Sequence, residues 1–508
     1  MKQSSIDRRC CSAVLAYTVL ALVLFSLIPS AFAQARTVLR GATLIDATGA
    51  PPLADSRIIV DKGLIICVSG PDGCKANPGE AELNFTGRFI TPGLIDTHVH
   101  LNFESNREEA IAEQALRFAF GITASRDAGT RVLDAALTHR SEAADPERPT
   151  PRLLVSARVS EQHAKRFGAK GAALVRALDE HGVDAIKLKD QLSVPAMTEV
   201  INAANKSDLP VFGHTWLGPP PVSMTQEAVE AGANGIVHLL SFAPWALREQ
   251  DRTATPESLG GEDAFWPWRK SLWLRIEDED FDPLIDLMVE RHVWLEPNLV
   301  WEFNFGRFIL PPAHMPFLRH SIISLRERIS GDPRMKRQQQ AVYPEAYKRM
   351  ASFVRRFHER GGMVVTGGDG QRPGIDIHIE MQLLRSAGLS AMASLQAATR
   401  DAAMALGRSS TLGTVEVSKR ADLVIFDANP LAASENTWRI HRVVKGGVIH
   451  NPEIILGPYK ERHAARIRAY WISRGTKVGL GLLVVFVGIG VALRLRRNRI
   501  RRSRQQSG

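Results

Sequence analysis

The chain has 508 residues, of which 44% are hydrophobic and 23% are charged, a composition that excludes a largely disordered chain and predicts a sizeable folded core. Its net charge of +10 is concentrated at the two ends, because residues 1–33 carry a net charge of +2 and the last 15 residues carry seven arginines and no acidic residue. Subtracting these two contributions leaves +1 for the body of the chain, which excludes a nucleic-acid-binding surface.

Residues 1–33 have the layout of a secretory signal peptide. Basic residues come first, the apolar run Ala13–Ile28 follows, and Ala31-Phe32-Ala33 supplies the small residues of a cleavage site. We expect cleavage after Ala33, and the alternative is an uncleaved membrane anchor.

Residues 34–90 alternate short β-type runs with turns, which predicts the first part of a small β-sandwich domain. Cys67 and Cys74 frame the turn-forming stretch VSGPDG. In an oxidising compartment these two cysteines can close a small hairpin with a disulfide, and two free thiols are the alternative.

Residues 91–410 alternate short apolar runs with helical segments, which predicts a closed (β/α)8 TIM barrel. The strands are expected near residues 94–101, 122–127, 152–158, 184–189, 210–215, 235–240, 293–299 and 363–368. Helices are expected near residues 107–118, 168–181, 194–204 and 224–231. Residues 411–453 return to β-type runs, and we expect them to complete the first domain because both segments flank the barrel.

Two insertions interrupt the later part of the barrel, at residues 247–280 and 302–351. The first contains four large aromatic residues: Phe265, Trp266, Trp268 and Trp273. Long loops after barrel strands usually shape the substrate site. The alternative is a surface cap, or a patch that rests on a nearby membrane.

The C-terminal end predicts a single membrane span. Residues 454–476 form a basic juxtamembrane connector, residues 477–496 a transmembrane helix around the uncharged run Val478–Leu493, and residues 497–508 a basic tail. Arginine-rich flanks stay in the cytoplasm. We therefore expect the tail inside the cell and the body of the chain outside the cytoplasm, in the periplasm if the source is bacterial.

The stretch TPGLIDTHVHL ends a predicted strand with two histidines, His98 and His100. They are two residues apart, so both imidazoles point to the same side of a strand, and neutral imidazole is a common metal ligand. Further candidates lie near the carboxyl ends of later strands: Lys187, with Lys189 as its register alternative, His214, His238 and Asp369. Each of these alone is more often a structural or surface residue. Together they indicate a metal site, because barrel active sites are built at that face.

With these motifs the chain resembles the amidohydrolase superfamily, and within it the imidazolonepropionase and Xaa-Pro dipeptidase (prolidase-like) branch. The resemblance spans residues 37–453, and its most specific pieces are TPGLIDTHVH, GITASRDAG, VDAIKLK, AVEAGANGIVH, TGGDG and LGTVEVSKRADLVIFDANPL. It implies two divalent metal ions held by six side chains: His98, His100, Lys187, His214, His238 and Asp369. The histidine pair in THVH is implied to bind the first ion, and the two later histidines the second.

The resemblance also implies particular chemistry for the two remaining ligands. Lys187 would carry a carbamate formed with carbon dioxide and bridge the two ions, and Asp369 would bind the first ion and act as general base. Two ions about 3.5–4 Å apart can hold a bridging hydroxide and polarise a carbonyl, which implies hydrolysis of an amide or a related carbon–nitrogen bond in a small or dipeptide-like substrate. Zinc is the first candidate, and manganese and cobalt are alternatives.

Two departures from the branch put the substrate in doubt. Trp216 stands where the branch often has a second histidine, two residues after His214. The glycine- and histidine-rich loop after the third strand is replaced by SARVSEQHAKR, in which His163 is a candidate substitute or a surface residue. The substrate therefore need not be a proline dipeptide.

Other functions stay open at this stage. One is a mononuclear deaminase, or a hydrolase of cyclic amides or lactones, of the same superfamily. Another, from a different class, is a membrane-tethered binding protein without catalytic activity. The chain has neither a dinucleotide-binding nor a P-loop fingerprint. Assembly into a homo-oligomer is an open possibility.

Overall fold

The computed structural model describes residues 36–101, 103, 106–160, 170–189, 192–215, 225–239, 241–247, 270–305, 343–369, 372–459 and 461. The predicted signal peptide, transmembrane helix and basic tail lie outside these residues, as do large parts of both insertions. Within the described part, none of the helices combines the length and the apolar composition that a membrane crossing requires.

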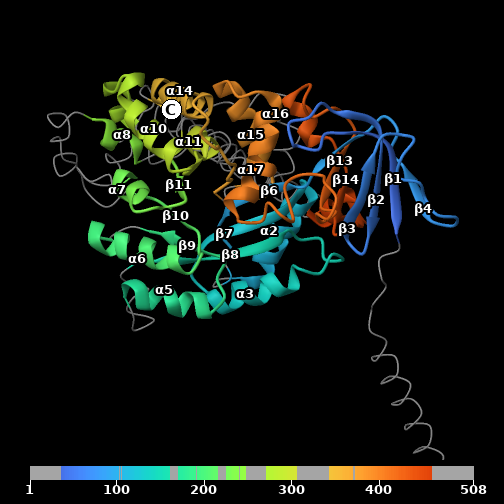
Figure 1. Cartoon of the computed structure of the whole chain (residues 1–508), viewed down its shortest axis with the longest axis horizontal. Coiled ribbons are helices and arrows are strands. Elements are labelled where there is room, and N and C mark those ends of the chain that lie inside the picture. Colours follow the sequence, from blue (N-terminus) through green and yellow to red (C-terminus); the bar gives the residue numbers. More distant parts are fainter. Residues whose placement is uncertain are drawn as a thin grey trace, which may run out of the picture.

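The strands that flank the barrel in sequence form one mixed sheet, which lies at one end of the molecule (Figure 1). Its strand order is β15-β14-β13-β5-β1-β2-β3, and β4 also pairs with β1. The strands are β1 (Thr37–Leu44), β2 (Leu53–Asp61), β3 (Leu64–Ser69), β4 (Ala81–Asn84), β5 (Phe89–Pro92), β13 (Leu423–Phe426), β14 (Ile440–Lys445) and β15 (Val448–His450). The two flanking segments thus meet in one unit, as expected.

The strands are hydrogen-bonded into one continuous sheet, where a small β-sandwich domain was expected. Strand β1 is central to this sheet, because it pairs with β2 along one edge and with both β4 and β5 along the other. Its register with β2 shifts on either side of Ala42. Gly41 has a φ of +85°, and a Cβ there would lie 2.4 Å from Oγ1 of Thr86, so the irregularity requires glycine.

Cys67, on β3, and Cys74, in the turn after it, form a disulfide with their Cα atoms 5.8 Å apart. The crosslink closes the VSGPDG stretch between them. The predicted pairing of these two cysteines is therefore confirmed.

A second, parallel sheet has the strand order β12-β11-β10-β9-β8-β7-β6 and curls through the centre of the molecule (Figure 1). The strands are β6 (Leu94–Val99), β7 (Ile122–Thr130), β8 (Arg152–Val159), β9 (Ala185–Leu188), β10 (Val211–Gly213), β11 (Gly235–Val237) and β12 (Trp294–Glu296). On β9, Ile186 and Leu188 pack into the main hydrophobic core, whereas Lys187 between them points to the opposite, inner side. All seven strands were expected from their apolar runs, although β6, β9, β10, β11 and β12 are shorter than expected.

The eighth expected strand, near residues 363–368, is reduced to one bridge to β12. The segment nevertheless hydrogen-bonds to both edges of the sheet. The amide of Leu295 on β12 donates to the carbonyl of Met363 at 2.9 Å, and the amide of Thr97 on β6 donates to the carbonyl of Thr366 at 3.1 Å. The segment thus joins β12 to β6, and the TIM-like α/β fold is confirmed. The glycines of TGGDG, which are poor strand formers, explain why the last ladder is short.

Helices accompany the parallel sheet (Figure 1). They are α2 (Arg107–Ala119), α3 (Leu133–Glu142), α5 (Gly171–Glu180), α6 (Val194–Lys206), α7 (Thr225–Glu230), α8 (Phe242–Ala246), α10 (Asp282–Glu290), α11 (Leu299–Phe305), α14 (Tyr343–Glu359), α15 (Ile375–Ala387), α16 (Ala391–Ala397) and α17 (Arg400–Ala405). Short 3-10 helices are η3 (Trp273–Arg275), η4 (Asp278–Phe281) and η7 (Ser434–Trp438). The helices expected near residues 107–118, 168–181, 194–204 and 224–231 correspond to α2, α5, α6 and α7.

Two basic side chains connect the mixed sheet to the barrel. Nζ of Lys445, at the end of β14, donates to the carbonyls of Asp145, Arg148 and Thr150 at 2.8, 3.0 and 2.8 Å. Arg152, at the start of β8, forms a two-pronged ion pair with Asp422 at 2.6 and 3.2 Å. Both contacts lie at the amino end of β8, and they therefore hold the end of the barrel opposite the candidate site.

Candidate metal centre

All six candidate ligands lie at the carboxyl ends of the parallel strands. His98 belongs to β6, Lys187 to β9, and His214 follows β10 directly. His238, which follows β11, and Asp369, in the TGGDG loop, have φ values of +61° and +52°. Left-handed backbone is uncommon for such residues, and such strained positions cluster at active sites and ligand clamps.

The first group of converging atoms comes from β6 and the TGGDG loop. Nε2 of His98 lies 3.3 Å from Nε2 of His100, and Oδ1 of Asp369 lies 3.5 and 3.3 Å from these two nitrogens. The three ligand atoms are within 4.8 Å of one another, a spacing that can hold one metal ion.

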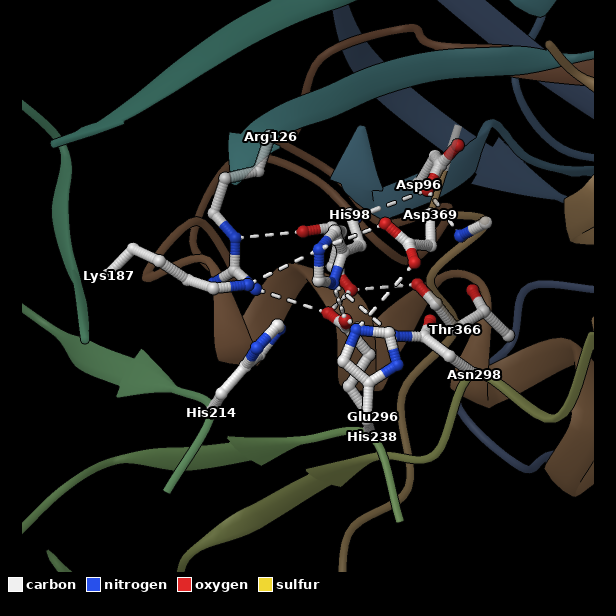
Figure 2. A network of polar contacts seen from close by, with 12 residues as sticks. Asp96, His98, Arg126, Lys187, His214, His238, Glu296, Asn298, Thr366 and Asp369 are labelled. Carbon is white, nitrogen blue, oxygen red and sulfur yellow. Dashed lines mark hydrogen bonds and ion pairs between the residues drawn. The ribbon is translucent and has the colours of Figure 1, made fainter. Parts of the chain in front are cut away.

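The second group brings together histidines from three strands. The rings of His214 and His238 have centroids 4.7 Å apart, and His98 lies 5.2 Å from His238 and 6.4 Å from His214. These three imidazoles also have ligand atoms within 4.8 Å of one another. Oδ2 of Asp369 lies 3.7 Å from Nε2 of His238. The two groups therefore form one cluster with His98 at its centre, and all of its members except His100 are labelled in Figure 2.

Lys187 reaches this cluster from β9. Its Nζ lies 3.3 Å from Nε2 of His98, and the side chain is buried. Burial lowers the pKa of Lys187 to about 7, so a large fraction of the amine is neutral near neutral pH and can react with carbon dioxide. Lys189, the register alternative, is half-buried and places Nζ 3.4 Å from Nδ1 of His214, at the edge of the cluster.

Burial also sets the charge of the imidazoles. It lowers the pKa of His98 and of His214 well below the usual value, and that of His238 to about 4. Burial alone would raise the pKa of Asp369, but its contacts with His98, His100 and His238 outweigh burial and lower the pKa. Neutral imidazoles beside an ionised carboxylate have the lone pairs that a cation requires.

The donor set fits divalent metal ions. Nε2 of His214 is buried and has no hydrogen-bond partner among the residues that the structure describes. An unpaired buried nitrogen is costly, and a metal ion would satisfy it. Four imidazoles and a carboxylate match the ligand preferences of zinc, and also those of manganese and cobalt.

Glu296, at the end of β12, is a buried residue of this site that sequence reasoning missed. Its Oε1 lies in close hydrogen-bond contact with Nδ1 of His98, and its Oε2 accepts from the Thr97 hydroxyl and, at 3.2 Å, from Nη2 of Arg126 (Figure 2). Nδ2 of Asn298 donates to Oε1 at 3.1 Å. The signal available in the sequence was the position of Glu296 at the end of an apolar strand, where the other candidates also lie.

Asp96 ties the histidine strand to the loop of Asp369. Its Oδ1 accepts from the amides of His98 at 3.2 Å and Gly368 at 2.9 Å. The neighbouring Gly367 has no room for a side chain, because a Cβ there would lie 2.7 Å from Cβ of His98. The TGGDG motif therefore needs glycine for close approach to β6.

Trp273 is the described member of the aromatic set in the first insertion, and it is a core residue. It is 1% exposed, stacks on Phe281 with ring centroids 5.1 Å apart, and meets Phe353 edge-on. Trp273 therefore packs in the core. Phe265, Trp266 and Trp268 lie outside the described residues, as do Trp216 and His163.

Comparison with known proteins agrees with this arrangement. The sequence model of the amidohydrolase family matches residues 89–450. The imidazolonepropionase of Idiomarina loihiensis is 24% identical over 156 residues, which cover 31% of this chain and 36% of that protein. The chain thus aligns with about a third of the length of this curated relative.

Solved structures share the fold. A Xaa-Pro dipeptidase with bound methionine in the active site superposes with a TM-score of 0.60 and 18% identity, over 82% of this chain and 100% of that one. Phenylurea hydrolase B gives a TM-score of 0.58 and 18% identity, over 82% and 97% of the two chains. At these identities the similarity concerns the fold.

Proposed function

The chain belongs to the amidohydrolase family, and from this premise we propose that it is a metal-dependent hydrolase of an amide or another carbon–nitrogen bond in a small or dipeptide-like substrate. We further propose that it uses two divalent ions, with zinc as the first candidate. In this proposal the two ions are held by six side chains: His98, His100, Lys187, His214, His238 and Asp369.

One observation carries the proposal. Side chains from the carboxyl ends of β6, β9, β10 and β11 and from the TGGDG loop converge within a few ångströms. The cluster is largely buried, except for His100, and it includes an imidazole nitrogen that has no partner among the described residues. Packing alone does not explain this convergence, because burying several polar groups without a ligand is costly. The neighbouring hydrolase folds support the same reaction class.

Divalent ions, when bound, supply a Lewis acid for the substrate carbonyl and lower the pKa of water. The residues of the chain do the rest. The ionised Asp369 accepts the proton of the attacking water and passes it to the leaving nitrogen. Lys187, if converted to a carbamate, would supply oxygen ligands for the ions. Glu296 holds the ring of His98 in place.

Elemental analysis of the purified full-length chain tests the proposal. About two zinc, manganese or cobalt ions per chain are expected, and chelation should abolish hydrolysis until one of these metals is returned. Hydrolysis is measured by screening the purified chain against dipeptides, N-acyl amino acids, cyclic amides and lactones. The variant His181→Ala changes the exposed histidine directly after α5. It serves as the matched control and should keep its metal. Metal content near zero, with no activity restored by zinc or manganese, would reject the proposal.

We also propose that residues 1–33 are a signal peptide and residues 477–496 a membrane anchor, with the body of the chain outside the cytoplasm. The Cys67–Cys74 disulfide supports this location, since disulfides persist in oxidising compartments. Protease added to intact spheroplasts or cells should digest the body and spare the arginine-rich tail. A body protected from the protease would overturn this topology.

A further inference from the structure

Arg126, on β7, is a charged residue inside the barrel that the proposed chemistry does not use. Its side chain is 1% exposed. The guanidinium lies over two aromatic rings, with Cζ 3.5 Å from the centroid of Phe212 on β10 and 5.1 Å from that of Trp294 on β12. Burial lowers the pKa of Arg126 to about 10, so the group is still charged at neutral pH. A buried charge is costly unless strong hydrogen bonds hold it.

Both hydrogen bonds of this guanidinium go to the surroundings of His98 (Figure 2). Nε donates to the carbonyl of Thr97 at 2.9 Å, and Nη2 donates to Oε2 of Glu296 at 3.2 Å. Thr97 directly precedes His98 on β6, and Glu296 ends β12. These two strands are the edges of the parallel sheet. Arg126 therefore bridges the two edges beside the central metal ligand.

The two bonds act on different parts of His98. The carbonyl of Thr97 and the amide of His98 belong to one planar peptide group, and the amide donates to Oδ1 of Asp96 at 3.2 Å. This peptide is therefore held from both sides, by Arg126 and by Asp96. Glu296 contacts Nδ1 of the imidazole, so the second bond of Arg126 acts on the ring. The Thr97 hydroxyl donates to the same carboxylate and closes the network.

A guanidinium is suited to this position because of its shape. It is planar and presents its donors in a fixed fork, so two acceptors on different strands can be held at a set angle. The ring of Phe212, 3.5 Å from Cζ, supports the face of this plane. A lysine ammonium is a point charge on a flexible chain and cannot reproduce both bonds in one plane.

We propose that Arg126 is a positioning residue of the metal centre, which orients His98 for metal binding through the Thr97 carbonyl and the Glu296 carboxylate. This inference rests on the proposed metal-dependent function and deepens it by naming a residue that acts on the ions through one of their ligands. Groups that orient a metal ligand contribute to affinity without binding the ion themselves.

The test measures zinc affinity of the purified full-length chain by competition with a chromophoric chelator. Arg126→Met keeps a long side chain and removes both bonds, so it should weaken zinc binding about 10- to 100-fold. Arg126→Lys keeps the charge and should lose less. Phe212→Leu removes the aromatic support, should also give a smaller loss, and decides the matter if neither Arg126 variant folds. The matched control is Arg176→Met, at an exposed arginine on α5, which should bind zinc like the wild type.

Two further readouts separate positioning from a merely structural role, which would lower stability alone. The visible absorption bands of the cobalt-loaded protein report the geometry of the ligands. They should shift in Arg126→Met and stay in place in Arg176→Met. In a chain that already carries Glu296→Gln, Arg126→Met should reduce zinc affinity by a smaller factor than in the wild type, because both residues act on His98 through the same contact.

Three results would each overturn the inference and leave the proposed function standing. They are a wild-type zinc affinity in Arg126→Met, cobalt bands that do not shift, and losses that simply multiply when Arg126→Met and Glu296→Gln are combined. A wild-type chain that binds neither zinc nor cobalt would reject the proposed metal centre, and the inference with it.

Discussion

Glu296 and His98 are in close hydrogen-bond contact, through Oε1 of the carboxylate and Nδ1 of the ring, although they come from the two edge strands of the parallel sheet. Both side chains are fully buried. With Nδ1–H donating to the carboxylate, the lone pair of Nε2 faces His100 and Asp369. The contact therefore selects the tautomer and the ring orientation that a metal ligand needs.

Glu296→Gln should weaken metal binding about 10- to 100-fold, because an amide orients the imidazole less strongly than a carboxylate. Competition with a chromophoric zinc chelator measures this affinity without reference to activity. Glu290→Gln, at an exposed position on α10, is the matched control. An affinity equal to that of the wild type would show that Glu296 does not position His98.

Lys187→Ala should reduce the metal content from about two ions per chain to one or none and abolish hydrolysis, because no other described lysine reaches His98. Lys189→Ala should keep both ions, since Lys189 contacts the edge of the cluster at His214. Elemental analysis and turnover are measured on the same samples. A Lys187→Ala protein with full activity would favour a one-metal enzyme.

Asp369→Asn should lower kcat by about 10²- to 10⁴-fold, the usual range for loss of a general base. Proton transfer is lost while the amide can still occupy the position of the carboxylate. Steady-state kinetics on metal-loaded protein provides the measurement, and Asp179→Asn on the exposed side of α5 should leave kcat unchanged. An unchanged kcat in Asp369→Asn would favour the non-catalytic binding protein.

Lys445→Met should lower the free energy of unfolding by about 2 kcal/mol, because three carbonyl groups lose a charged donor. Urea unfolding followed by circular dichroism gives the value. Lys348→Met removes an exposed lysine from α14 and should have almost no effect. Equal stability of the two variants would mean that Lys445 does not hold the sheet against the barrel.

Glu380 makes unfolding depend on pH. Its carboxylate accepts from the amides of Leu299 and Val300 at 2.9 and 2.6 Å, yet burial outweighs these bonds and raises its pKa to about 8 from an ordinary 4.5. Between these two pH values the folded chain keeps a proton that the unfolded chain has lost. The stabilisation is therefore complete below pH 4.5 and is lost as the pH rises through 8, with a slope of at most about 1.4 kcal/mol per pH unit.

The variant Glu380→Gln cannot titrate at this position. The free energy of unfolding of the wild type, minus that of Glu380→Gln, should fall as the pH rises from about 5 to 8. Urea titrations at several pH values measure this difference, and Glu290→Gln should run parallel to the wild type. A difference that is constant with pH would contradict the assignment.

Local patterns in the sequence were sufficient to predict the positions of most of the parallel strands. The apolar runs around Ile186 and Val211 mark buried strands, and ligands at strand ends follow from the geometry of such barrels. The last ladder is shorter than predicted, because the apolar run VVT is followed directly by the turn-forming glycines of TGGDG. The core position of Trp273 could not be predicted, because a tryptophan in an insertion has the same appearance in sequence whether it lines a site or a core.

The role of Glu296 could not be predicted for a different reason. The local partner of the Glu296 carboxylate is Asn298, two residues later, and it gives no indication of the contact with His98. That contact exists only because the segment at residues 363–368 joins β12 to β6. The same holds for the mixed sheet, in which β5 pairs with β13 although the whole barrel separates them in sequence. Contacts between distant segments carry little trace in local pattern.

The pairing of β5 with β13, from Phe89 with Phe426 to Pro92 with Leu423, has a consequence for synthesis of the protein. A ribosome makes β5 early and β13 only after the whole barrel. Throughout that interval the nascent chain presents β5 as an open strand edge, which invites association with other chains. Chains that stop before Leu423 should therefore aggregate, even though they contain every residue of the metal centre.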